Sequence, residues 1–306
     1  MTSRPSGFTA ADVPDQSGKC FVVTGANTGL GFEASRVLAA RGARIILACR
    51  DEAKANAAIG RIAAEAPGAD LRHLLYDQGD IDSIRRAAAE LVREPRIDAL
   101  VNNAGVMVPP LMRTKQGFEL QFGVNHLGAF VFTALLLPKL AQTPGARVVV
   151  TGSVAHTWGR IDWDDLNAHK GYRRWPRYSM SKLANLLFLF ELDQRLRAAG
   201  SPVTAVGCHP GFAATDLGRH MPGIGLLWPI FSPFSNSAAM GAWPTLQAAT
   251  GEIRAGAYYG PLGFREIRGR SGMARRAPQA TDAASACRLW NASIAMSGID
   301  PGLPPA

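Results

Sequence analysis

Six short runs rich in β-branched and apolar residues alternate along this chain with stretches of helical periodicity. The runs are residues 20–24, 44–49, 71–76, 97–101, 147–151 and 203–208. Runs of this kind, separated by helical stretches, are the pattern of consecutive βαβ units. The sequence therefore predicts an α/β fold with one doubly wound parallel sheet and helices on both faces. No internal repeat or low-complexity linker divides the chain, so residues 1–306 are expected to form a single domain.

Composition and charge limit the class of protein. The chain has 306 residues, 47% of them hydrophobic, which is enough for a substantial core. Its net charge of +9 is spread along helical stretches, and only residues 265–276 form a basic cluster. A nucleic-acid-binding protein needs a concentrated basic helix or interleaved aromatic residues, so no nucleic-acid partner is predicted.

The cysteines and the apolar runs bear on location. Four widely spaced cysteines suit buried thiols in a reducing compartment, and no metal site is predicted; they are Cys20, Cys49, Cys208 and Cys287. No secretory signal opens the chain, and no apolar run approaches the roughly 18–20 residues that span a bilayer. A cytoplasmic protein is expected. The apolar segment 224–234 contains two prolines, and a substrate lid, a dimer contact and a peripheral membrane contact remain alternatives for it.

A glycine-rich turn follows the first predicted strand. Gly25, Gly29 and Gly31 lie between that strand and a helical stretch that runs to Arg41. Glycines at this place let the backbone approach a pyrophosphate, while the N–H groups of the helix N-terminus supply positive potential. The spacing differs from the commoner GxGxxG, and a tight turn alone is the alternative. Its placement between a strand and a helix favours a Rossmann-type dinucleotide site.

The end of the second strand bears on which dinucleotide is bound. A carboxylate there binds the ribose hydroxyls of NAD, whereas a basic residue suits the 2′-phosphate of NADP. Cys49 is followed by Arg50, so NADP(H) is favoured over NAD(H). The neighbouring Asp51 weakens this preference, and a surface arginine is the alternative.

Tyr178 and Lys182 are four residues apart in a helical stretch. Positions i and i+4 share one face of a helix, so an ammonium can lie beside a phenol. A neighbouring cation favours the phenolate and lowers the phenol pKa, which makes Tyr178 a candidate proton donor and acceptor. Taken alone, the pair is better explained as a surface contact.

Together these features resemble the short-chain dehydrogenase/reductase family. The motifs that carry the resemblance follow the family's order over about residues 15–220: the turn at 24–31, Asn102-Asn103-Ala104-Gly105, Asn125-His126-Leu127-Gly128, Ser153, Tyr178 with Lys182, and His209-Pro210-Gly211. Residues 48–51, 125–128 and 153–156 are similar to the retinol dehydrogenase and protochlorophyllide reductase-like branch. Members of that branch act on lipophilic alcohols, aldehydes or ketones, so the resemblance implies a lipophilic small-molecule substrate.

The resemblance also implies a role for each matching residue. Tyr178 is the expected acid and base, Lys182 is expected to lower its pKa and hold the nicotinamide ribose, and Ser153 is expected to bind the substrate oxygen. Asn125 is expected to order a proton-relay water with Lys182. The expected cofactor-binding residues are Gly25, Asn27, Thr28, Gly29, Leu30, Gly31, Arg50, Asp77, Gln78, Asn103, Ala104, Gly105, Tyr178, Lys182, Pro210, Gly211 and Thr215.

Two departures from the family pattern concern geometry rather than chemistry. Thr151-Gly152 precedes Ser153 where the branch more often has Asn-Val-Ser, and Gln78 follows Asp77 where a leucine is common. Neither departure removes a reacting group. They bear on the turn at the serine and on packing near the adenine.

The remaining segments have expected roles around this site. Residues 212–250 are expected to form a substrate-covering insert, 255–260 a last strand and 281–297 a C-terminal helix. The loop between Ser153 and Tyr178 is expected on the substrate side, with Trp158, Trp163 and Trp175. A homodimer face and ordinary core burial are alternative explanations for Phe130, Phe132, Phe188 and Phe190.

The sequence thus predicts an NADP(H)-dependent oxidoreductase that interconverts a lipophilic alcohol and its aldehyde or ketone. The alternative is a nucleotide-sensing binding protein that keeps the Rossmann fold without turnover. Loss of Tyr178 or Lys182 would mark that alternative, and both residues are present.

Overall fold

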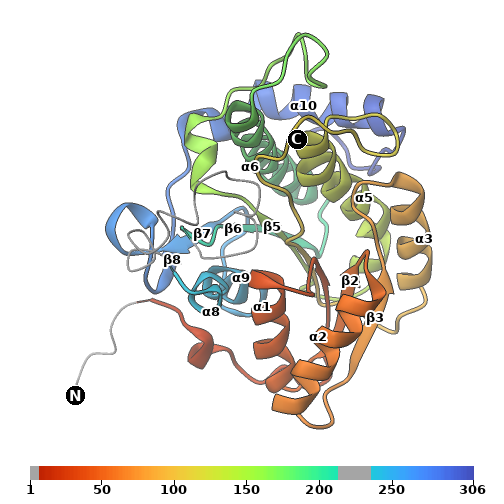
Figure 1. Ribbon diagram of the computed structural model, residues 1–306, viewed down its shortest axis with the longest axis vertical. Helices are drawn as coiled ribbons and strands as arrows, with labels where there is room; N and C mark the ends of the chain where they lie inside the picture. The colour runs from red at the N-terminus through yellow and green to blue at the C-terminus, as the bar shows by residue number, and fades with distance from the viewer. Residues whose placement is uncertain (1–6, 213–235) are drawn as a thin grey trace.

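The computed structural model describes residues 7–212 and 236–306, and these form one eight-stranded sheet of order β3-β2-β1-β4-β5-β6-β7-β8 (Figure 1). The strands are β1 (Cys20–Thr24), β2 (Arg44–Cys49), β3 (Leu71–Leu75), β4 (Ala99–Asn102), β5 (Arg147–Thr151), β6 (Thr204–Cys208), β7 (Tyr258–Pro261) and β8 (Ser271–Met273). Strands β1 to β7 run parallel, and the order winds outward in both directions from β1 and β4. The predicted doubly wound Rossmann-type domain is confirmed.

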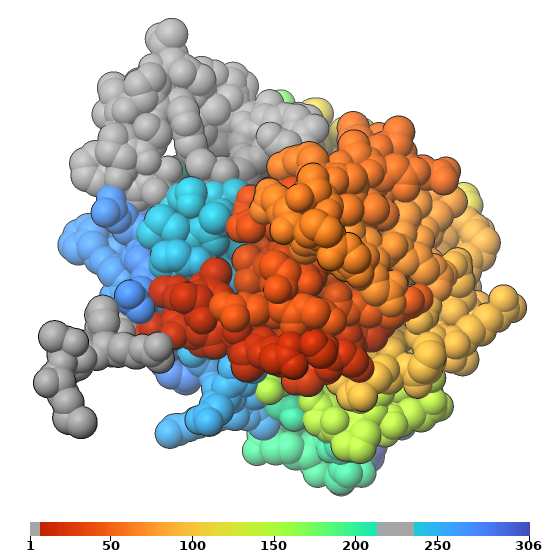
Figure 2. Space-filling view, turned by 90° about the horizontal axis from the view of Figure 1, so that it is seen from below, coloured from red at the N-terminus to blue at the C-terminus, as the bar shows by residue number. Residues whose placement is uncertain are grey.

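Helices cover both faces of the sheet. One face carries α1 (Gly29–Ala40), α2 (Glu52–Glu65), α8 (Ala238–Gly241) and α9 (Trp243–Thr250). The other carries α3 (Ile81–Leu91), α4 (Leu120–Phe122), α5 (Ala129–Leu140), α6 (Arg174–Ala198) and α10 (Ala283–Ser297). In Figure 2, α8 lies directly beside the helices of the first two βα units, and it packs on α1. Because both faces are covered, the inner strands are apolar throughout, and every residue of β1 is buried.

The far edge of the sheet differs from the predicted pattern. The last parallel strand is Tyr258–Pro261, slightly later than residues 255–260, and β8 runs antiparallel to it. The expectation of an entirely parallel sheet is therefore corrected at this edge. With three residues, one of them a glycine, β8 is too short for a period-2 pattern to reveal.

A long apolar helix crosses the core beside β4 and β5. It comprises α4, a π-helical turn at Gly123–Gly128 and α5, so it begins at Leu120 rather than near Asn125. By length and composition, Leu120–Leu140 would suffice to span a membrane, which corrects the expectation that no such run exists. However, 89% of its most apolar window is buried inside the protein, as in the core helix of a globular domain.

The C-terminal helix α10 packs on α5 and α6 (Figure 1). Trp290, only 2% exposed, meets Phe130 edge-on at 5.3 Å and stacks on Phe188 at 6.1 Å between ring centroids. The guanidinium of Arg195 lies 4.7 Å from the centre of the Trp290 ring. Core burial within one chain therefore accounts for Phe130 and Phe188, which α10 covers. Phe132 is buried against Tyr76, and Phe190 is only half-buried.

Removal of the Trp290 ring should destabilise the fold. We expect Trp290→Ala to lower the free energy of unfolding by about 3–5 kcal/mol, the usual cost of truncating a buried aromatic side chain. Urea denaturation followed by circular dichroism measures this change. Trp158→Ala is the matched control, because Trp158 is 74% exposed and should change stability by no more than about 0.5 kcal/mol. Equal effects of the two changes would contradict the assigned packing.

Candidate active site

The turn from β1 to α1 has the backbone shape of a phosphate-binding loop. Gly25 and Gly29 have φ angles of +66° and +58°, which favour glycine. A Cβ on Gly31 would lie 2.5 Å from both the Gly25 carbonyl oxygen and Asn103 Nδ2. Asn103 Nδ2 in turn donates to the Thr24 carbonyl oxygen at 2.8 Å, which holds the turn against the loop after β4. This glycine-lined turn at a helix N-terminus fits a dinucleotide.

The other predicted residues of this turn contribute in different ways. Thr28 is the N-cap of α1, and Asn27 precedes it. Leu30 is only 6% exposed and packs in the core, so its backbone is the part that faces the turn. Ala104 N donates to Thr24 Oγ1 at 2.9 Å, which brings the second predicted loop to the first.

Arg50 lies exposed at the carboxyl end of β2. No hydrogen bond or ion pair engages its guanidinium within residues 7–212 and 236–306. Asp51, its acidic neighbour, instead caps α2: its carboxylate accepts from the Lys54 N–H at 3.0 Å and pairs with Lys54 Nζ at 3.1 Å. The Lys54 hydrogen bonds lower the pKa of the Asp51 carboxyl. The acidic residue is thus committed to the helix, and Arg50 is the charge left facing solvent at this strand end.

The side chains of Asp77 and Gln78, which follow β3, make different hydrogen bonds. Asp77 is half-buried and accepts from the Gly79 N–H at 2.9 Å. Gln78 Nε2 donates to the carbonyl oxygens of Ala104 and Val124, at 3.1 Å and 2.6 Å. Gln78 Oε1 accepts from the Tyr76 hydroxyl at 3.1 Å. The Gln78 side chain therefore joins two loops of the protein, and its predicted cofactor contact could come only from its backbone.

Ser153, Tyr178 and Lys182 meet at the carboxyl end of β5. Tyr178 is 6% exposed, and the Ser153 side chain lies close enough to its phenol to lower the phenol pKa. Ser153 Oγ accepts a hydrogen bond from the Ala155 N–H at 3.1 Å. The hydroxyl proton of Ser153 remains free to be donated. Lys182 Nζ lies 6.0 Å from the centre of the Tyr178 ring and donates to the Thr151 carbonyl oxygen at 3.2 Å. The predicted catalytic side chains are therefore adjacent.

Asn125 lies in the π-helical turn beside this cluster, a distortion often found at functional sites. Its Nδ2 donates to Val106 O and Ser181 Oγ, each at 2.9 Å, and its Oδ1 accepts from Val106 N at 2.7 Å. The side chain thus holds the loop after β4 against α6. A Cβ on Gly105 would lie 3.0 Å from Asn125 Oδ1 and 3.7 Å from Lys182 Nζ, so Gly105 leaves space between them.

Burial dominates the ionisation of the two central groups. It raises the pKa of Tyr178, while the hydrogen bond from Ser153 lowers it by less. Burial also lowers the pKa of Lys182 to about 8. The lowering expected from Lys182 does not appear among the causes of the Tyr178 shift. The reason is that the ammonium is directed at the Thr151 carbonyl oxygen and is itself desolvated.

The predicted nicotinamide-side residues follow β6. Gly211 has a φ of +71°, and its N–H donates to His209 Nδ1 at 3.2 Å. Asn236 Nδ2 donates to the Pro210 carbonyl oxygen at 3.0 Å. Thr215 and the apolar segment 224–234 lie outside the described residues.

Known proteins of similar sequence identify the family of this chain. The family model for short chain dehydrogenases matches residues 19–222. Retinol dehydrogenase 12 of Homo sapiens is 42% identical over 287 residues, covering 92% of this chain and 87% of that protein. Retinol dehydrogenase 14 of Homo sapiens is 39% identical over 303 residues, with the same coverage of 92% and 87%. The chain belongs to the short-chain dehydrogenase/reductase family. It is an oxidoreductase of the retinol dehydrogenase-like branch that acts on alcohol and carbonyl groups.

Solved structures agree with this assignment. An uncharacterized protein from Mycobacterium Paratuberculosis superposes with a TM-score of 0.81 at 40% identity, covering 96% of this chain and 99% of that one. A short chain dehydrogenase from Burkholderia cenocepacia J2315, in complex with NADP, has a TM-score of 0.64 at 23% identity, with coverage of 80% and 96%. The second likeness shows the fold alone.

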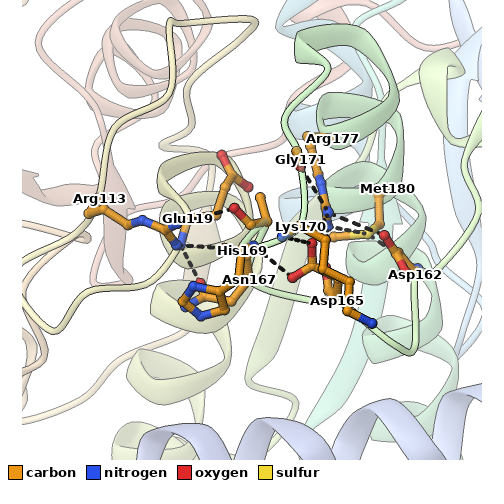
Figure 3. A network of polar contacts seen from close by, with 11 residues as sticks. Arg113, Glu119, Asp162, Asp165, Asn167, His169, Lys170, Gly171, Arg177 and Met180 are labelled. Carbon is orange, nitrogen blue, oxygen red and sulfur yellow. Dashed lines mark hydrogen bonds and ion pairs between the residues drawn. The ribbon is translucent and has the colours of Figure 1, made fainter.

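A buried ion pair fixes the loop that leads to Tyr178 in this short-chain dehydrogenase/reductase (Figure 3). Arg177 and Asp165 have side chains only 8% and 5% exposed, and their charged atoms lie 3.2 Å apart. Arg177 Nη1 also donates to the Asp165 carbonyl oxygen at 2.6 Å. The Asp165 carboxylate accepts from the N–H groups of His169 and Lys170, each at 2.8 Å. Arg177 thus anchors residues 162–171 to the first turns of α6.

The same loop is tied to the segment after β4. Arg113 donates to the carbonyl oxygens of Asn167 and Ala168, and Asn167 Oδ1 accepts from the Glu119 N–H (Figure 3). The sequence did not predict these contacts, because the residues that make them lie about fifty positions apart and no local pattern pairs them.

Val108, like Ala168, has a positive φ angle close to these contacts. Its φ of +47° is unusual for a β-branched residue, and its N–H donates to Gln121 Oε1 at 2.9 Å. Gln121 Nε2 donates to the Tyr172 hydroxyl at 2.9 Å, and that hydroxyl donates to Pro109 O at 2.8 Å. Val108 packs with Ala155 against Tyr178. The surroundings of the phenol are therefore apolar on this side.

Two tryptophans expected on the substrate side lie elsewhere. Trp158 and Trp163 line a groove of about 660 Å³ together with Leu183 and Leu187 of α6. At about 100° per residue, these leucines lie roughly 140–180° around the helix from Tyr178. Trp175 is the one of the three beside the phenol, at 6.0 Å between ring centroids. The expectation is corrected for Trp158 and Trp163.

The Ser153 hydrogen bond should appear in the pH dependence of oxidation. Because it lowers the pKa of Tyr178, Ser153→Ala should raise that pKa and move the rise in kcat/KM for alcohol oxidation to higher pH. Activity at neutral pH would then fall more than activity at alkaline pH. Steady-state rates between about pH 6 and 10 measure the shift. A profile that drops uniformly, with an unmoved limb, would contradict the assigned bond.

Proposed function

We propose that this protein is an NADP(H)-dependent oxidoreductase that interconverts a lipophilic alcohol and its aldehyde or ketone, with Tyr178 as the acid and base. The observation that carries the proposal is the placement of Ser153 beside Tyr178, with Lys182 one helical turn away, at the strand ends that also carry the glycine turn. Ligands of open α/β sheets bind at these strand ends.

Ser153 and Tyr178 have different roles in the proposed reaction. In reduction, Ser153 donates a hydrogen bond to the carbonyl oxygen, and Tyr178 gives its proton to that oxygen as it becomes a hydroxyl. In oxidation, the Tyr178 phenolate takes the hydroxyl proton back. A bound nicotinamide cofactor supplies the hydride in one direction and accepts it in the other. Lys182, Gly25, Gly29 and Gly31 would hold that cofactor.

Three further features support the finer parts of the proposal. Arg50, with Asp51 committed to its helix cap, favours NADP(H) through the 2′-phosphate. The apolar contacts of Val108 and Ala155 with Tyr178 favour a lipophilic substrate, in keeping with retinol dehydrogenases among the relatives. Free cysteines with buried thiols favour a cytoplasmic location. A homodimer would have to use a surface other than the one that α10 covers.

Tyr178→Phe tests the assigned acid and base. We expect turnover of a medium-chain aliphatic aldehyde to fall by about 10²-fold or more, because the hydroxyl that transfers the proton is lost. Cofactor affinity, measured by calorimetry, should stay close to that of the unchanged protein. Turnover that remains near normal would refute the role. If neither NADPH nor NADH binds the unchanged protein, the nucleotide-dependent function fails altogether.

Arg50→Ala tests the cofactor preference. Loss of a charge-assisted contact to the 2′-phosphate should weaken NADPH binding by roughly tenfold or more while NADH binding changes little. Dissociation constants for the two nucleotides, measured on the same preparation, provide the internal control. An equal loss with both nucleotides would show that Arg50 does not read the 2′-phosphate.

A further inference from the structure

Gly152, one of the positions at which the sequence departs from the family pattern, lies against a residue of a distant strand. Tyr258 of β7 is 1% exposed, and its ring lies beneath the turn that carries Ser153. A Cβ on Gly152 would lie 2.7 Å from the Tyr258 hydroxyl oxygen and 3.1 Å from its Cε2. A Cβ on Gly207, in the neighbouring β6, would lie 2.9 Å from Tyr258 Cδ2. Two glycines therefore make the space that the Tyr258 ring fills.

The hydroxyl of Tyr258 is buried, and no hydrogen-bond partner for it is found among the described residues. No group in the described parts of the chain, residues 7–212 and 236–306, bonds to it with ordinary hydrogen-bond geometry. Burial raises the pKa of the Tyr258 phenol well above its ordinary value, and the Ser153 backbone N–H acts in the opposite direction as a weak donor. Burying a hydroxyl without a partner costs stability, so a phenylalanine would stabilise this position better. Stability therefore does not explain why this residue is a tyrosine.

Two histidines fix the ring in place. His156 meets it edge-on at 5.7 Å, and His209 packs against it at 5.1 Å between ring centroids. His156 Nδ1 donates to the Ser153 carbonyl oxygen at 2.6 Å, and its Nε2 accepts from the Ala277 N–H at 3.1 Å. The ring is thus held by a residue that is itself bonded to the serine turn.

We propose that Tyr258 is a positioning residue, whose hydroxyl supports the Gly152–Ser153 turn from below and sets the place of the Ser153 hydroxyl beside Tyr178. This inference rests on the proposed catalytic role of Ser153 and Tyr178. Tyr258 touches no reacting atom. It acts through the turn, and Gly152 is the residue that lets it do so.

Gly152 and Tyr258 can be tested by a rescue experiment, in which a second substitution restores activity that the first one removes. Gly152 lies outside the left-handed region of backbone conformation, so Gly152→Ala adds side-chain contacts without backbone strain. The shortest of these is with the Tyr258 hydroxyl oxygen at 2.7 Å, and Leu186 Cδ2 and Tyr258 Cε2 follow at 3.1 Å. It should lower kcat by roughly tenfold or more, since small displacements of a catalytic group are costly, while NADPH affinity is unchanged. Tyr258→Phe should lower kcat by about threefold with an equal or higher melting temperature. The double variant should recover from the Gly152→Ala level toward that of Tyr258→Phe, because the oxygen that makes the shortest contact with the new Cβ is gone.

Controls separate this inference from the function it rests on. Tyr259→Phe is the same change one residue along β7, on the opposite face of the sheet, and should leave kcat unaltered. Ser153→Ala must itself abolish most turnover; if it does not, the catalytic assignment fails first. Where Ser153→Ala is inactive, normal kcat in Gly152→Ala or in Tyr258→Phe overturns the positioning role. A double variant that stays at the Gly152→Ala level overturns it as well.

Discussion

The carbonyl oxygen of Thr151, at the end of β5, accepts hydrogen bonds from two side chains of α6. Lys182 Nζ donates at 3.2 Å and Asn185 Nδ2 at 3.1 Å. These bonds fix the rotation and height of α6 against the sheet. Tyr178, one helical turn before Lys182, is thereby placed opposite Ser153, which follows Thr151 by two residues. The relative placement of Tyr178 and Ser153, the proposed catalytic pair, is thus set by a backbone carbonyl oxygen.

The same contact determines the electrostatics of the site. A raised pKa keeps Tyr178 protonated at neutral pH, which is the form that reduction of a carbonyl requires. Lys182 has a pKa of about 8 instead of its ordinary 10.5, so folding disfavours its protonated form. This burial costs stability below pH 8, and the cost fades as pH rises from 8 toward 10.5. Ser153 is the group that opposes burial at Tyr178, which makes its exact placement important.

Local patterns in the sequence predict the parts of this fold that depend on neighbouring residues. The strand-helix alternation, the glycine turn and the Tyr178–Lys182 spacing all lie within short windows, and each is found in the structure. The rise that burial causes in the Tyr178 pKa was not predicted, because burial depends on the whole fold. β8 was missed because it is short, and Trp163 was misplaced because a loop's path follows from contacts such as Arg177 with Asp165.

The support of the serine turn shows why such a site needs distant residues. Ser153 lies just past β5, where the chain leaves the sheet and loses the strand's hydrogen bonds. Tyr258 reaches it from β7, two strands away in the sheet, through space that Gly152 and Gly207 leave open. In a chain with a larger residue at position 152, that residue would fill the space itself. A glycine there and a tyrosine at 258 therefore form one structural unit, and a substitution at either position has to be judged with the other.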